Sequence, residues 1–172
     1  MPSQSVWIGI TIGVFFVGFA IGIVPYYLEQ KTVEENITRF DYLDFVSFNE
    51  RDWEIFNEIH SSDVLVGWPD GRETHGIEEH SVDVEFIFTY APDVKIIDHP
   101  ITFGQGEWTA GMGIVEGTFS EPMILPDGTV IEPTGNQFKY TMITIARWQD
   151  GQITEEYLFW DNAEIARQMG IN

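Results

Sequence analysis

The sequence predicts an α+β domain in which N-terminal helices pack on one face of a curved antiparallel sheet, preceded by one transmembrane helix. Three observations lead to this order. Residues 6–28 carry no charge, residues 29–90 are mostly helical in period, and residues 94–160 alternate as long strands. Helices and strands that are segregated along a chain are typical of α+β domains.

The apolar segment at residues 6–28 is long enough to cross one bilayer, which takes about 20 residues. A cleaved secretory signal is the competing interpretation, but no Lys or Arg precedes the segment and no clear small-x-small cleavage site follows it. We therefore expect a retained single-pass anchor. Charge gives little guide to orientation, since only Lys31 and Arg39 follow closely, and we expect the domain outside the cytoplasm.

The predicted organisation is a tail (1–5), the anchor (6–28), a juxtamembrane segment (29–37) and one domain (38–172). The formal net charge of −20 argues against nucleic acid as a partner. The chain has no cysteine, and its four histidines lack the spacing of a metal motif. We expect no cofactor and no metal, since a metal site would require tertiary convergence of distant ligands.

The elements follow from local patterns. Helical stripes predict helices at 29–48, 49–60 and 76–90, and His60 falls on the stripe of the second. A short strand is predicted at 63–68. The later strands are predicted at 94–103, 107–119, 137–149 and 152–160, with a Pro- and Gly-rich loop or small ribbon at 121–135. A last helix, 162–169, is ended by Gly170.

The last two strands meet at Asp150-Gly151, a strong hairpin signal. Regular alternation on the second strand places five residues on one face: Ile153, Glu155, Tyr157, Phe159 and Asp161. An apolar wall raises the pKa of a carboxyl group, so Asp161 is a candidate acid or base.

Several short motifs follow one another along the chain: Ala91-Pro92-Asp93, Gly117-Thr118, Pro133-Thr134-Gly135, and the final hairpin with Asp161 and Gln168-Met169-Gly170. Their order and spacing together carry a family resemblance. Over residues 38–171 the chain resembles the SnoaL-like polyketide cyclases of the nuclear-transport-factor-2-like (NTF2-like) superfamily. The resemblance implies a cone with a deep apolar pocket between the curved sheet and the helices. It also implies a homodimer that forms through the open face of the sheet.

The resemblance further implies cofactor-independent ring closure by intramolecular aldol chemistry, with Asp161 as general acid/base on a small apolar carbonyl compound. His99 is a second catalytic candidate, because it shares a strand face with Ile97 and Ile101. The chain departs from the family at Phe119, where many relatives have His, and at Tyr157, where Trp is frequent. The residues expected to line the pocket are Trp68, His80, Tyr157, Phe159, Phe119, Glu155 and Arg147.

Each of these assignments has an alternative. Asp161 sits where an N-cap of the last helix would stand, and Glu155 is placed to pair with Arg147 across the hairpin. Gly111, Gly113 and Gly117 leave a strand face bare, which means either sheet curvature or pocket volume. Two function classes remain: a cyclase, isomerase or hydrolase, and a membrane-tethered module that binds a small molecule or a protein.

Overall fold

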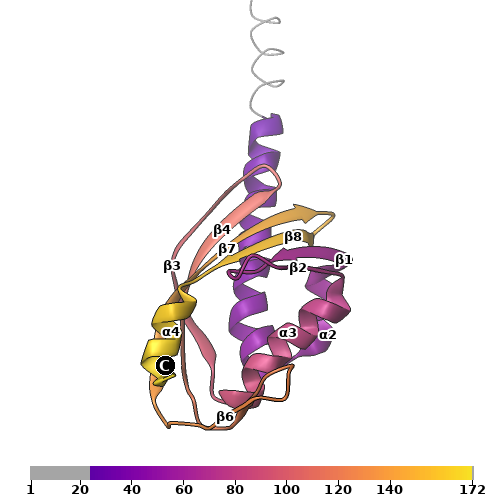
Figure 1. Ribbon diagram of the computed structural model, residues 1–172. Coiled ribbons are helices and arrows are strands. Elements are labelled where there is room, and N and C mark those ends of the chain that lie inside the picture. The colour runs from indigo at the N-terminus through magenta and orange to yellow at the C-terminus, as the bar shows by residue number, and fades with distance from the viewer. Residues whose placement is uncertain (1–23, 172) are drawn as a thin grey trace, which may run out of the picture.

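The computed structural model describes residues 24–171. A helix over residues 24–42 continues as a π-helical turn, η1 (Leu43–Phe48). Figure 1 shows this helix, in indigo and purple, running lengthwise beside the strands. Among the residues that are described, no helix is long and apolar enough to cross a membrane. Most of the predicted anchor, residues 6–23, lies outside that range.

Six strands form one curved sheet (Figure 1) in the order β2-β1-β8-β7-β4-β3. The strands are β1 (His60–Gly67), β2 (Glu73–His75), β3 (Lys95–Gln105), β4 (Trp108–Thr118), β7 (Gln137–Gln149) and β8 (Gln152–Phe159). Every neighbouring pair is antiparallel except β1 and β8, which are parallel. The expectation of a wholly antiparallel sheet is wrong at this pair, where no hairpin links the two strands.

Three shorter helices pack against strands of the sheet: α2 (Trp53–Ile59), α3 (Ile77–Tyr90) and α4 (Asn162–Met169). In Figure 1, α2 and α3 lie below β1 at the right of the view, and α4 lies at the left, where it packs on β7. The predictions of strand 137–149 and helix 162–169 are confirmed. The ribbon β5 (Met123–Ile124) and β6 (Val130–Ile131) occupies the segment predicted as a loop or small ribbon.

The predicted helix 49–60 begins later and ends earlier than expected. Arg51 has a φ of 59°, which interrupts the helix, and the side chain of Asp52 accepts a hydrogen bond from the backbone N–H of Ile55 to begin α2. His60 is extended, with φ −92° and ψ 149°, and it opens β1. This change moves His60 from a helix surface to the buried start of a strand.

The glycine face of β4 is filled by aromatic side chains. A Cβ at Gly111 would overlap the ring of Phe40, and one at Gly117 would lie 2.7 Å from Phe138. At Gly113 the nearest atom would lie at an ordinary 3.4 Å. Two of the three glycines therefore admit rings from the long helix and from β7.

Candidate functional site

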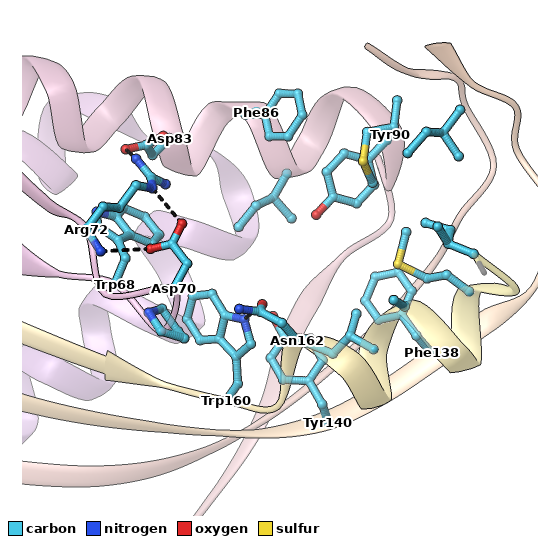
Figure 2. Close-up of a pocket in the computed structure, with 18 residues that line it drawn as sticks. Trp68, Asp70, Arg72, Asp83, Phe86, Tyr90, Phe138, Tyr140, Trp160 and Asn162 are labelled. Carbon is cyan, nitrogen blue, oxygen red and sulfur yellow. Dashed lines mark hydrogen bonds and ion pairs between the residues drawn. The ribbon is translucent and has the colours of Figure 1, made fainter. Parts of the chain in front are cut away.

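An aromatic cavity of about 380 Å³ opens between α3, α4 and β7. Figure 2 shows Phe86 and Tyr90 of α3 facing Phe138, Tyr140 and Trp160 across it. Such a lining suits an apolar ligand with a few polar groups.

One end of this cavity carries charge. There Arg72 bridges Asp70, at 3.0 Å, and Asp83, at 2.7 Å. The guanidinium of Arg72 also lies 4.8 Å from the centroid of the Trp68 ring.

A second cavity, of about 60 Å³, adjoins the first, and we call it the inner cavity and the first one the outer cavity. Four residues line both cavities: Trp68, Ile87, Tyr140 and Trp160. The polar lining of the inner cavity consists of Asp44, His60, His80, Thr144 and Glu156. The volume is that of about two water molecules. It therefore admits the polar end of a ligand whose apolar part occupies the outer cavity.

His60, His80 and Glu156 are buried together, although they come from β1, α3 and β8. The Glu156 Oε2 lies 3.2 Å from Nε2 of His80 and 3.9 Å from Nε2 of His60. Burial opposes ionisation of Glu156, but the hydrogen bond to His80 and the charge interaction with it outweigh burial and lower the pKa of Glu156. Burial, with the charge of His80, lowers the pKa of His60 to about 4. His60 is therefore neutral at pH 7.

His99 of β3 connects Asp44 to the surface. Its Nε2 lies 2.9 Å from Oδ2 of Asp44, and its Nδ1 lies 2.7 Å from Oδ1 of Asp41. Burial raises the pKa of Asp44 to about 6, against the hydrogen bond and charge of His99. Burial also disfavours the imidazolium of His99, but the two carboxylates outweigh it and raise its pKa. The Asp44 side chain lines the inner cavity, whereas that of Asp41 is 43% exposed.

Asp161 is placed as the N-cap of α4. Its Oδ1 accepts a hydrogen bond of 3.0 Å from the backbone N–H of Glu164, and the residue is exposed. Asp161 does not line either of the two cavities, although its neighbours Trp160 and Asn162 line the outer one. Of the two interpretations of Asp161, an acid in the pocket or an N-cap of the last helix, this geometry is that of the N-cap.

A β-bulge explains why the alternation predicted on β8 is wrong. Ile153 pairs with Trp148 but Glu155 pairs with Arg147, so Thr154 is an extra residue on β8. Beyond it, the inward side chains are those of Glu156 and Leu158. The row that contains Glu155, Tyr157 and Phe159 faces the other side of the sheet.

Of the seven residues predicted to line the pocket, two line the cavities and five do not. Trp68 and His80 line the inner cavity. Glu155 accepts hydrogen bonds from Arg147 and from the hydroxyl of Tyr157, away from the cavities, and Phe159 is 51% exposed. Phe119 is completely buried and packs edge-on against Tyr90, with ring centroids 6.1 Å apart. The position that departs from the family pattern therefore belongs to the core.

A model of the SnoaL-like polyketide cyclase family matches residues 38–169. This chain belongs to that family. No protein with a curated function matches it. Among solved structures, the SnoaL-like domain is similar to IdmH, a proposed polyketide cyclase from Streptomyces antibioticus, with 25% identity, a TM-score of 0.64 and coverage of 78% of this chain and 98% of that one.

Two further structures share the fold. A proposed SnoaL-like polyketide cyclase from Jannaschia sp. CCS1 has 16% identity and a TM-score of 0.71, with 81% of this chain and 94% of that chain covered. An NTF2-like protein from Burkholderia pseudomallei has 17% identity and a TM-score of 0.64, with 78% and 97% covered. The predicted SnoaL-like, NTF2-like α+β fold is confirmed.

Of the four acidic or histidine residues that line the inner cavity, three were absent from the candidates based on the sequence: Asp44, His60 and Glu156. Asp44 carried a usable signal, since it lies four residues after Phe40 and three before Ser47, on the buried stripe of the first helix. His60 and Glu156 were hidden by a misplaced helix end and by the bulge. Only the three-dimensional pairing of β1 with β8 brings these two together.

Proposed function

We propose that this SnoaL-like domain is an enzyme of the cyclase or isomerase type that acts on a small apolar carbonyl compound, with Asp44 as the general acid/base. The observation that carries the proposal is a buried carboxyl group at the inner end of an aromatic cavity, hydrogen-bonded to His99. A catalytic base works best when its pKa lies near the working pH. The pKa of Asp44, about 6, meets this condition.

The chemistry starts at a C–H bond next to the carbonyl group. Asp44 takes the proton, and the electron pair of that bond moves onto the carbonyl oxygen as an enolate. In a cyclase the enolate carbon then forms a bond to a second carbonyl carbon, and Asp44 returns its proton to the new alkoxide. In an isomerase the proton returns to a different carbon. The aromatic walls position the ligand and exclude water.

The test is hydrogen–deuterium exchange at the α-carbon of small aromatic ketones and β-dicarbonyl compounds in D₂O, followed by NMR with the full chain in mild detergent. We expect catalysed exchange that Asp44→Asn reduces by at least about 100-fold, the scale of a general base. Asp161→Asn is the matched control, because Asn also caps helices well. Exchange that persists in Asp44→Asn but is lost in Asp161→Asn would overturn the assignment of Asp44.

The alternative function is a binding module, and the aromatic lining of the outer cavity favours it. The same experiment separates the two classes. A compound that quenches tryptophan fluorescence on binding, but whose α-protons never exchange faster than in buffer, supports the binding module.

We also propose that residues 6–28 anchor the domain in a membrane, with the domain outside the cytoplasm, on the strength of the uncharged apolar sequence. The full chain should stay in the membrane fraction after an alkaline carbonate wash. A protease added outside intact cells should digest the domain. Release of the chain into the supernatant would contradict the anchor.

The open sheet face supports a homodimer. A row of apolar side chains crosses four strands by direct pairing: Ile101, Met112, Ile143 and Phe159. Ile101 and Phe159 are each 51% exposed. Burial of this row against a second copy would remove apolar surface from water. Sedimentation should show a dimer that Ile101→Glu dissociates, whereas Val82→Glu on α3, where Val82 is 67% exposed, leaves it intact.

A further inference from the structure

Beside Asp44, the lining of the inner cavity includes two histidines and a glutamate. We infer that His60, His80 and Glu156 bind one divalent transition-metal ion. The three donor atoms, one from each residue, all lie within 4.8 Å of one another. They come from three separate elements and are all buried.

The hydrogen bond of His60 fixes its tautomer. Its Nδ1 lies 2.8 Å from the carbonyl oxygen of Phe56. A carbonyl oxygen only accepts, so Nδ1 carries the proton and donates it. Nε2 therefore presents a lone pair. This arrangement, with one ring nitrogen donating to a carbonyl and the other free to bind, is typical of metal-ligating histidines.

That lone pair has no hydrogen-bond partner within the described residues, although the His60 side chain is completely buried. It faces the carboxylate of Glu156 at 3.9 Å, so two acceptors confront each other. A buried, unsatisfied polar atom is costly. A cation placed between Nε2 and the carboxylate would satisfy both groups at once.

The spacing suits a metal ion. Ligand distances of 2.0–2.2 Å in tetrahedral geometry place the ligand atoms about 3.4 Å apart. The two carboxylate–imidazole separations, 3.2 and 3.9 Å, lie on either side of this value. Two imidazoles and one carboxylate favour zinc or iron(II) over magnesium or calcium, which prefer all-oxygen ligands. The fourth position would face the inner cavity, which Glu156 and both histidines line.

A metal bound by the triad would add a group that stabilises the enolate to the site in which Asp44 is the base. This catalytic role of the metal, but not its binding, rests on the proposed function. The carbonyl oxygen of the compound would bind the open position, where the metal stabilises the enolate that forms when Asp44 takes the proton. The sequence had led us to expect no metal. The ligands lie 20, 76 and 96 positions apart along the chain, which no local motif spans.

The test uses the full chain in mild detergent, treated with a chelator, dialysed and titrated with Co²⁺. We expect one equivalent to bind with visible absorption bands of nitrogen- and oxygen-coordinated Co²⁺, and Zn²⁺ to displace it. His60→Gln and Glu156→Gln should each weaken binding by more than about 100-fold, since loss of even an outer-shell partner costs 10- to 100-fold. His75→Gln removes an exposed histidine of β2 and should leave the affinity unchanged.

Absent cobalt bands, or a weakening in His75→Gln as large as in the triad variants, would overturn the metal site. Circular dichroism checks that each variant is folded. The two proposals fail separately. If the chelated, metal-free protein still catalyses α-proton exchange at the full rate, the catalytic role of the metal is overturned and the proposed function stands, while the Co²⁺ titration alone decides whether the triad binds a metal. If Co²⁺ binds but no compound exchanges, the metal site stands and the proposed function fails.

Discussion

The carboxylate of Asp44 lies 2.9 Å from Nε2 of His99, whose other ring nitrogen lies 2.7 Å from Asp41. Since both carboxylates accept, both ring nitrogens are donors and the imidazole is positively charged. The His99 ring is held between Phe40, stacked at 5.1 Å, and Phe45. A buried acid therefore faces the cavity on one side and a fixed positive charge on the other.

The first prediction concerns the pKa of Asp44. His99 lowers it through a hydrogen bond and a charge, while burial raises it to about 6. Replacement of His99 by Gln should therefore raise the Asp44 pKa above 6. Carboxyl NMR titration measures this, with His75→Gln as the control. An unchanged pKa in His99→Gln would show that His99 does not determine the acidity of Asp44.

The second prediction concerns stability against pH. The pKa of Asp44 is 3.8 unfolded and about 6 folded, so its contribution to stability is fully present below about pH 3.8 and is lost as the pH rises through 6. Two pH units correspond to about 3 kcal/mol. Between pH 4 and 7, wild type should lose this much free energy of unfolding relative to Asp44→Asn.

Urea denaturation at several pH values checks this result. The titrating groups that act on Asp44 are His99, Asp41 and Glu156. Asp44→Asn also removes the group that chiefly raises the pKa of His99, so the comparison reports the coupled Asp44–His99 pair. Parallel stability profiles for wild type and Asp44→Asn would contradict the raised pKa.

The third prediction tests the glycine face of β4. Gly111→Ala should destabilise the domain by about 1–3 kcal/mol, because the new methyl group overlaps the Phe40 ring. Gly113→Ala is the matched control on the same strand, with its nearest contact at 3.4 Å. Thermal unfolding compares the two. Equal melting temperatures would mean that the long helix moves freely away from β4.

The fourth prediction concerns Asp161. Asp161→Ala should reduce the free energy of unfolding by about 1 kcal/mol, because Ala cannot accept the hydrogen bond from Glu164, whereas Asp161→Asn should be nearly neutral. Chemical denaturation distinguishes the variants. A loss in Asp161→Asn as large as in Asp161→Ala would indicate that the charge of Asp161, rather than its cap, stabilises the fold.

The periodicity of the chain predicted most elements, because helices and long strands leave local signals. Strand 137–149 and helix 162–169 have the expected bounds, since turn residues and a capping Asp mark their ends. The family resemblance supplied the sheet packed on helices. The parallel pairing of β1 with β8 left no local signal, because its partners lie about 90 residues apart.

The site was harder to predict than the fold. Trp68 and His80 were identified because large aromatic or apolar surroundings marked them. Asp44 was overlooked because a carboxylate on a helix is ordinarily solvated, and its burial depends on the distant His99. Glu156 was assigned to the wrong face by a single extra residue, and this error also directed attention to Asp161.

That extra residue, Thr154, divides β8 into two parts whose alternation of inward and outward side chains is offset by one residue. Toward the turn, Ile153 faces the core opposite Trp148, and beyond the bulge Glu156 faces it opposite Ala146. Regular pairing would force one of these two side chains outward, because three positions separate them. The bulge therefore lets one short strand supply both an apolar side chain to the core and the carboxylate of the inner cavity.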